Sequence, residues 1–252
     1  MFHRSSEKGI IFFPDNDLIG TPTDYGLEYE EVWFAAEDEV RLHGWWVPRP
    51  GAPVLLWFHG NVGNISYWLE ILKSLHNLAE VQVFIFDYRE YGKSQGHISR
   101  AGTFKDAAAV YHYVTKTRKV PPGEIIFFGR SLGTVLATDL AVRVPCRSVI
   151  IEAAFTSFSD IAKLYAPLIF DWRLRVPYDN LGKIDKLKVP LLIIHGSDDE
   201  FIPVEMARRL FSKAKEPKEL YIIAGAHHND TFEVGGREYL ERLKTFIYRL
   251  KK

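Results

Sequence analysis

Several features are scarce in this 252-residue chain, and each scarcity excludes a class of protein. The only cysteine, Cys146, rules out an internal disulfide, and we interpret it as a small structural residue of a protein in the reducing cytoplasm. Lys and Arg number 32, as do Asp and Glu, so the formal charge is zero and the electrostatic footprint of a nucleic-acid-binding protein is missing. No apolar run approaches the roughly 18 residues that a membrane span requires.

Signals for secretion and for metal binding are also missing. The apolar run Ile10–Phe13 is too short for the hydrophobic region of a signal peptide. His227 and His228 are adjacent, but they lack the further ligands that a zinc site needs. We therefore expect a cytoplasmic protein without metal or cofactor, either a monomer or a small homo-oligomer.

Strand and helix patterns alternate from residue 54 to the end of the chain. We predict strands over 54–58, 81–86, 125–128, 148–151, 191–194 and 220–223, and helices over 65–79, 103–116, 134–142, 205–212 and 237–250. Before them, 31–35 and 40–47 indicate an antiparallel hairpin, and 1–28 is predicted to be irregular. Such alternation is typical of an α/β protein with a mostly parallel central sheet and helices on both faces.

Residues 1–252 are predicted to form a single domain. The one irregular insertion, at about 155–187, is rich in aromatic residues and is interrupted by Pro167 and Pro177. It is too short for an independent domain, so we interpret it as a cap over the site.

The stretch Gly129-Arg130-Ser131-Leu132-Gly133 stands between a predicted strand and a predicted helix. A serine between two glycines at such a turn is the pattern of a nucleophile elbow, in which the tight turn leaves no room for side chains at the glycine positions. The turn exposes the serine hydroxyl and aims the first N–H groups of the helix at a developing oxyanion. Ser131 is therefore the candidate nucleophile.

A serine nucleophile needs a histidine base and a carboxylate that orients the histidine, and on sheets of this kind they follow in the order serine, acid, histidine. The acid candidates Asp198 and Asp199 directly follow the strand at 191–194, and Glu152 after the strand at 148–151 is an outside alternative. The base candidates His227 and His228 follow the last strand. Both pairs stay open on this reasoning alone.

The oxyanion hole requires two backbone donors. One is expected to be the N–H of Leu132, which follows the nucleophile, and the other the N–H of Asn61 in the loop after the strand at 54–58. Gly60 and Gly63 would let that loop approach a substrate closely. We interpret His59 as a packed, hydrogen-bonded loop residue, and the polar stretch 87–94 as a loop fixed by hydrogen bonds of its own side chains.

Taken together, these motifs resemble the α/β-hydrolase superfamily, and within it the compact serine hydrolases of the Bem46-like group, which are related to serine aminopeptidase-like hydrolases. The resemblance extends from about Phe13 onward and rests on the segments 59–61, 63–65, 87–89, 92–94, 129–133, 155–157, 179–181, 195–196 with Asp199, and 225–226 with 228–230. It implies an α/β-hydrolase fold with Ser131 as nucleophile, Asp199 as acid and His228 as base. The chain departs from the pattern at Glu90 and His227, where this group usually has glycine.

We therefore expect a serine esterase, of carboxylesterase type, that acts on small-molecule esters with small to medium acyl chains through an acyl-enzyme. Aromatic and aliphatic residues of the insertion would line an apolar acyl pocket: Phe155, Phe158, Tyr165, Leu168, Phe170 and Trp172. The alternative is a thioesterase for acyl-protein or acyl-CoA substrates. A peptidase or a non-catalytic binding module on the same scaffold is less favoured.

Overall fold

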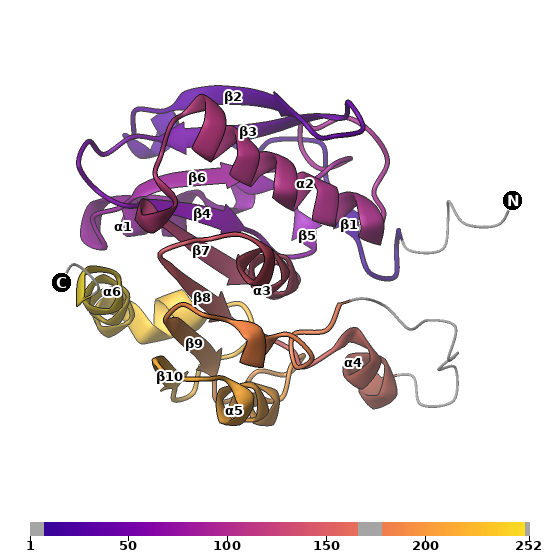
Figure 1. The fold of residues 1–252 in the computed structure, drawn as a ribbon, viewed down its shortest axis with the longest axis vertical. Helices are drawn as coiled ribbons and strands as arrows, with labels where there is room; N and C mark the ends of the chain where they lie inside the picture. The colour runs from indigo at the N-terminus through magenta and orange to yellow at the C-terminus, as the bar shows by residue number, and fades with distance from the viewer. Residues whose placement is uncertain (1–7, 166–177, 250–252) are drawn as a thin grey trace, which may run out of the picture.

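The centre of the molecule is a twisted eight-stranded sheet (Figure 1), seen in a computed structural model that describes residues 8–165 and 178–249. The strand order is β10-β9-β8-β7-β4-β6-β3-β2. The strands of this sheet are β2 (Glu30–Ala35), β3 (Arg41–Val47), β4 (Val54–Phe58), β6 (Gln82–Phe86), β7 (Ile125–Arg130), β8 (Ser148–Glu152), β9 (Leu191–Gly196) and β10 (Lys218–Ile223). β4 and β6–β10 pair in parallel, whereas β2 and β3 form the antiparallel hairpin that the sequence predicted.

The continuous apolar runs of the central strands are explained by burial on both faces of the sheet. In β4, for example, Val54, Leu56 and Phe58 belong to the hydrophobic core on one face. Leu55 and Trp57, which alternate with them, belong to the core on the other face. An alternating polar pattern would leave one of the two cores unfilled.

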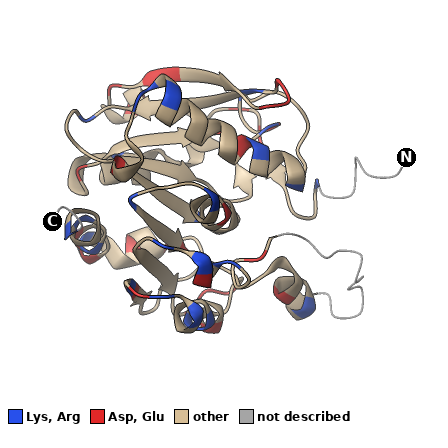
Figure 2. Cartoon of the chain, viewed as in Figure 1, with Lys and Arg blue, Asp and Glu red and all other residues tan. Residues whose placement is uncertain are grey.

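Helices cover both faces, as expected for parallel strands joined by crossovers (Figure 1). α1 and α6 contribute their apolar residues to one core, and α2, α3 and α5 to the other. The helices are α1 (Leu69–Leu78), α2 (Arg100–His112), α3 (Gly133–Arg143), α4 (Phe158–Tyr165), α5 (Val204–Lys213) and α6 (Thr231–Arg249). Lys, Arg, Asp and Glu intermingle on these helices (Figure 2), in keeping with the zero net charge.

Some predicted boundaries were wrong for identifiable local reasons. The helix predicted from residue 65 begins as a 3-10 turn (Ile65–Trp68), where the side chain of Asn64 accepts the N–H of Ser66. α6 begins at Thr231, six residues before the predicted start, and is interrupted at Gly236, which has the non-helical angles φ 49° and ψ −131°. Only glycine adopts such angles readily, so the kink falls on this residue.

The N-terminal region predicted to be irregular contains one element that matters for the site. β1 (Phe13–Pro14) pairs in parallel with β5 (Val62–Gly63), in the loop that follows β4. A two-residue strand leaves no periodic signal in the sequence, so it could not be predicted.

The loops that follow β4, β7, β9 and β10 all leave the sheet at the carboxyl ends of parallel strands. These ends share one edge of the sheet, where α/β proteins bind their ligands. α4 belongs to the insertion predicted at about 155–187, whose residues 166–177 lie outside the described part. Within residues 8–165 and 178–249, no helix is long and apolar enough to span a membrane.

Candidate active site

Ser131 lies at the turn between β7 and α3 with a backbone φ of +51°, the left-handed region that costs a non-glycine residue roughly 1–2 kcal/mol. Its N–H donates to the carbonyl oxygen of Glu152 on β8 at 2.9 Å, which holds the turn in place. A Cβ atom on Gly129 would lie 2.6 Å from the carbonyl oxygen of Gly133, and one on Gly133 would overlap the carbonyl group of Phe58. The crowding expected for this motif is therefore present.

A chain of hydrogen bonds joins three side chains that are far apart in the sequence. Nε2 of His228 lies 3.2 Å from Oγ of Ser131, and Nδ1 lies 2.8 Å from Oδ2 of Asp199. Because a carboxylate only accepts, Nδ1 carries the proton of the neutral imidazole, and the lone pair of Nε2 faces the serine hydroxyl. This is the arrangement in which an imidazole can take the hydroxyl proton.

Asp199 is buried and fixed on both of its carboxylate oxygens. Oδ1 accepts the N–H groups of Phe201 at 2.9 Å and Ile202 at 2.7 Å. Burial alone would raise the pKa of Asp199, but the hydrogen bond and charge of His228, with the N–H of Ile202, outweigh it and lower that pKa. His195 lies 3.4 Å from Oδ2, and its Nε2 donates to the carbonyl oxygen of Ile202 at 2.7 Å. The carboxylate therefore stays ionised beside the imidazole.

The competing candidates lie elsewhere. Asp198 is exposed, and His227 has a side chain that is 54% exposed and contacts Asp230 at 3.2 Å. Glu152 points into the protein, where its carboxylate pairs with Arg130 at 3.0 Å. None of the three is hydrogen-bonded to the serine hydroxyl.

The two expected oxyanion donors line the same pocket as Ser131. Among the described residues, no acceptor takes the backbone N–H of Asn61 or of Leu132. Nδ1 of His59 lies 2.7 Å from the carbonyl oxygen of Gly60, so it donates there. Since the C=O and N–H of a trans peptide point in opposite directions, this bond turns the N–H of Asn61 away from His59.

The carbonyl group of Asn61 is fixed from the other side. It accepts the hydroxyl of Tyr91 at 2.7 Å and the N–H of Phe13 at 2.9 Å, and the Asn61 side chain donates to the carbonyl oxygen of Ile11 at 2.8 Å. The N-terminal segment thus helps to set the loop that carries the expected donor. Sequence reasoning missed this role, because it depends on main-chain pairing rather than on residue type.

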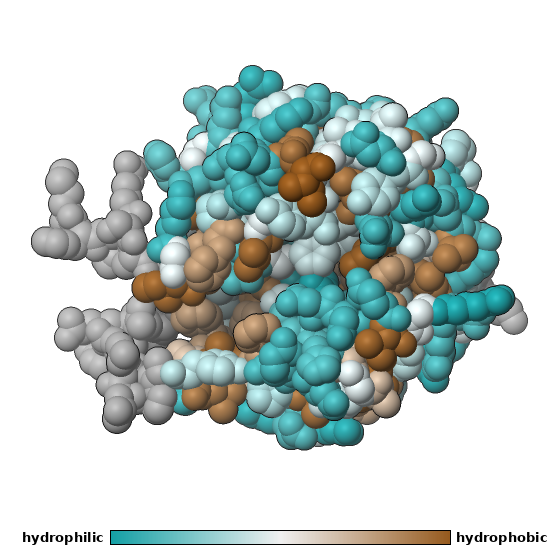
Figure 3. Space-filling model, turned by 180° about the vertical axis from the view of Figure 1, so that it is seen from behind, coloured by the Kyte–Doolittle hydropathy of each residue, from teal (hydrophilic) through white to brown (hydrophobic). Residues whose placement is uncertain are grey.

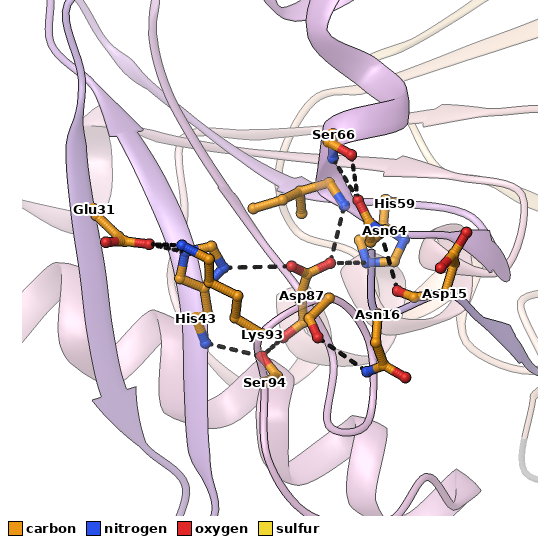
Figure 4. A network of polar contacts seen from close by, with 12 residues as sticks. Asp15, Asn16, Glu31, His43, His59, Asn64, Ser66, Asp87, Lys93 and Ser94 are labelled. Atoms are coloured by element: carbon orange, nitrogen blue, oxygen red, sulfur yellow. Dashed lines mark hydrogen bonds and ion pairs between the residues drawn. The ribbon is translucent and has the colours of Figure 1, made fainter. Parts of the chain in front are cut away.

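Asp87 supports this loop from within the protein (Figure 4). Its Oδ1 accepts the N–H of Ile65 at 2.9 Å and lies 4.0 Å from Nε2 of His59, while Oδ2 lies 3.5 Å from Nδ1 of His43. His59 is fully buried, and burial lowers its pKa. It is therefore a neutral, packed residue, which fits its sequence interpretation.

Side chains of the loop after β6 fix that loop, as the sequence suggested. The guanidinium of Arg89 pairs with buried Asp106 at 2.8 Å. Glu90, which stands where the similar group usually has glycine, has a φ of +67°. Its carboxylate accepts Nζ of Lys8 at 2.6 Å and the N–H of Ile98 at 2.7 Å, and these bonds offset the strain of the left-handed backbone.

A pocket with a volume of about 540 Å³ opens above Ser131, and its walls are mostly apolar. Its apolar lining comes from five parts of the chain: Ile10, Ile11 and Phe13; Val62 and Trp68; Leu132; Phe155, Phe158, Ile161 and Tyr165; and Phe201 with Ile202. In Figure 3, hydrophobic residues gather at the left of the described part of the molecule.

The predicted wall residues of the insertion have different outcomes. Phe155, Phe158 and Tyr165 line the pocket, whereas Leu168, Phe170 and Trp172 lie outside the described residues. The N-terminal contribution to the wall was not foreseen.

The described residues contain no group of three or more His, Cys, Asp or Glu side chains that could hold a metal ion. Cys146 is buried, and burial raises the pKa of its thiol to about 12. Its thiol therefore stays protonated at neutral pH, and the residue is chemically inert.

Comparison with known proteins finds a matching family model and similar curated proteins. A family model described as "alpha/beta hydrolase fold" matches residues 53–183, and one described as "PhoPQ-activated pathogenicity-related protein" matches 156–252. The chain is 31% identical to uncharacterized protein Rv2307c of Mycobacterium tuberculosis, over 98% of this chain and 89% of that protein. It is 30% identical to alpha/beta hydrolase domain-containing protein WAV2 of Arabidopsis thaliana, over 90% of this chain and 81% of that one.

Among solved structures, the fold is similar to that of the Pyrococcus furiosus esterase Pf2001. The TM-score is 0.78 with 22% sequence identity, over 94% of this chain and 98% of that chain. At this identity the likeness concerns the fold.

Proposed function

The chain belongs to the alpha/beta hydrolase fold family, and from this premise we propose that it is a serine hydrolase that cleaves carboxylic esters of small to medium acyl chains. The observation that carries the proposal is the hydrogen-bonded line from Ser131 through His228 to Asp199, at 3.2 Å and 2.8 Å. In this proposal they are the nucleophile, the general base and the carboxylate that orients the base.

The first half of the reaction forms an acyl-enzyme. Oγ of Ser131 attacks the ester carbonyl carbon while Nε2 of His228 takes the hydroxyl proton. The oxygen of the tetrahedral intermediate accepts hydrogen bonds from the N–H groups of Asn61 and Leu132. Each bond lowers the free-energy barrier of the reaction by about 3 kcal/mol. The imidazolium then gives its proton to the departing alcohol, and the C–O bond of the ester breaks.

The second half of the reaction reverses these roles with water in place of the alcohol. Nε2 of His228 takes a proton from a water molecule, which attacks the acyl carbon. The same two N–H groups hold the oxyanion, and the imidazolium returns its proton to Oγ of Ser131 as the acid leaves. Asp199 stays ionised throughout and keeps the imidazole in the required tautomer.

The pocket supports an apolar acyl group as the recognised part of the substrate. Its volume of about 540 Å³ is that of a site for a small molecule, and its lining carries few polar groups besides those of Ser131 and His228. The proposal includes a single domain over residues 1–252 with a cap-like insertion at about 155–187. A cytoplasmic location stays a prediction from the cysteine content.

Turnover of a series of p-nitrophenyl esters, from acetate to dodecanoate, tests the proposal together with matched thioesters. We expect wild-type protein to prefer short or medium chains and Ser131→Ala to lose turnover. Ser212→Ala, an exposed residue on α5, is the control and should keep wild-type rates. Equal rates for wild type and Ser131→Ala would refute the proposal, and preference for thioesters by kcat/KM would replace the ester with the thioester as substrate.

A further inference from the structure

Arg130, the residue before the nucleophile, has its guanidinium inside the protein, with only 3% of the residue exposed. Nε donates to Oε1 of Glu152 at 3.0 Å, and Nη2 donates to the carbonyl oxygen of His228 at 2.7 Å. The guanidinium carbon lies 4.7 Å from the centre of the Trp68 ring, which lines the pocket. One rigid, planar group therefore connects β8, the loop at 224–230 that carries His228 (the histidine loop) and the pocket wall.

Glu152 is the hub that holds this guanidinium in position. Besides Arg130, its carboxylate accepts the hydroxyl of Thr231 at 2.6 Å and that of Tyr239 at 2.5 Å. Thr231 begins α6, directly after the histidine loop. The backbone carbonyl of Glu152 also accepts the N–H of Ser131. A single residue is thus hydrogen-bonded to both the nucleophile turn and the end of the histidine loop.

Oppositely charged side chains hold the two peptide groups of His228. Oε2 of Glu200 accepts its N–H at 3.1 Å, and Arg130 donates to its C=O at 2.7 Å. Charge-assisted hydrogen bonds of this kind are stronger than neutral ones and restrict the backbone on both sides of the imidazole. The bond from Arg130 is the buried one of the two, because Glu200 is exposed.

We propose that Arg130 is a positioning residue that fixes the distance between the base and the nucleophile. This inference rests on the proposed function of Ser131 and His228. The backbone of Arg130 leads directly into Ser131, and its side chain holds the carbonyl of His228, so one residue sets both ends of the 3.2 Å contact. The imidazole is then held in place through both halves of the reaction.

The first test is Arg130→Lys. Lysine keeps a positive charge opposite Glu152, but its single ammonium lacks the fork that reaches Glu152 and the carbonyl of His228 together. We expect kcat per active site, titrated with a fluorophosphonate, to fall by up to about 100-fold, because small misplacements of catalytic groups have effects of this size. KM should stay unchanged. A loss of folded protein alone would lower the number of titrated sites and leave kcat per site intact.

Arg147→Lys is the matched control. Arg147 also donates to a backbone carbonyl, that of Ile247 at 3.0 Å, but it lies before β8, at the end of the strand opposite Glu152. We expect this variant to keep the wild-type kcat per titrated site.

The double variant Arg130→Met/Glu152→Gln removes both charges together, so that folding is not burdened by an unpaired buried charge. It leaves the carbonyl of His228 without its donor, and we expect kcat per site to fall at least as far as in Arg130→Lys. Wild-type kcat per site in either variant would overturn the inference while leaving the proposed function intact. Unchanged turnover in Ser131→Ala would instead overturn the proposed function itself.

Discussion

Replacing Asp199 by asparagine is the most direct test of the hydrogen-bonded line from Ser131 through His228 to Asp199, because the structure dictates how the new amide must lie. Oδ1 of Asp199 accepts two backbone N–H groups, those of Phe201 and Ile202. The amide oxygen of asparagine has to take this position, since the opposite orientation would set an NH₂ group against both donors. Leaving a buried donor such as the N–H of Ile202 without an acceptor costs about 1–3 kcal/mol.

The NH₂ group therefore takes the place of Oδ2, 2.8 Å from Nδ1 of His228. His195 does not oppose this exchange, because its Nε2–H keeps the carbonyl of Ile202 as acceptor. An amide N–H that faces Nδ1 favours the tautomer with the proton on Nε2, and Nε2 can then no longer accept the proton of Ser131. We expect kcat to fall about 10⁴-fold, as a wrong tautomer does in a serine triad, which corresponds to about 5.5 kcal/mol.

Steady-state turnover of a p-nitrophenyl ester measures this loss, and thermal unfolding shows that the variant is folded. Asp198→Asn is the control, because Asp198 is exposed and adjacent in the chain. We expect it to keep wild-type turnover. The reasoning is wrong if Asp199→Asn keeps more than a tenth of the wild-type kcat, or if Asp198→Asn loses as much.

Two predictions concern stability. Gly133→Ala should lower the free energy of unfolding, measured in urea, by about 3 kcal/mol or more, because the new Cβ would overlap the carbonyl of Phe58. Gly123→Ala is the control: its Cβ would have no heavy atom within 4 Å, so it should change this free energy by less than about 0.5 kcal/mol. Similar values for the two variants would contradict the crowding argument. Acidification should also destabilise the protein, because burial lowers the pKa of His59 and of His195 below 6.5 in the folded state, so the unfolded chain binds more protons. The free energy of unfolding should be full above pH 6.5 and fall below that pH by up to about 1.4 kcal/mol per pH unit for each histidine. A free energy of unfolding in urea that is the same at neutral pH and at about pH 5 would refute this.

Apart from α4 and the short strands β1 and β5, the order of strands and helices could be predicted from the sequence because its causes are local. The apolar runs of the central strands can only be buried on both faces, and the helical segments between them impose parallel crossovers. The glycines around Ser131 likewise indicate a tight turn wherever the rest of the chain lies. Boundaries such as the start of α6 depend on contacts of single side chains, and they were predicted less well.

Which of two adjacent residues faces the serine is not a local property. His227 and His228 have the same chemistry, and so do Asp198 and Asp199, but only one member of each pair lies in the hydrogen-bonded line. That outcome depends on where two loops, some 100 and 70 residues beyond Ser131 in the sequence, leave the sheet. The resemblance to a known family favoured one member of each pair, whereas the residues alone left both open.

The sequence by itself determined the layered fold, the strained turn at Ser131 and the kinds of side chain available to act on it, because spacing and residue type act over a few neighbouring positions. Only the tertiary structure decided that the N-terminal segment fixes the loop of Asn61 and that Arg130 holds the carbonyl of His228. Backbone N–H and C=O groups are the same in nearly every residue, so the sequence does not show which of them will pair. Their partners are chosen when the folded sheet brings distant loops to one edge.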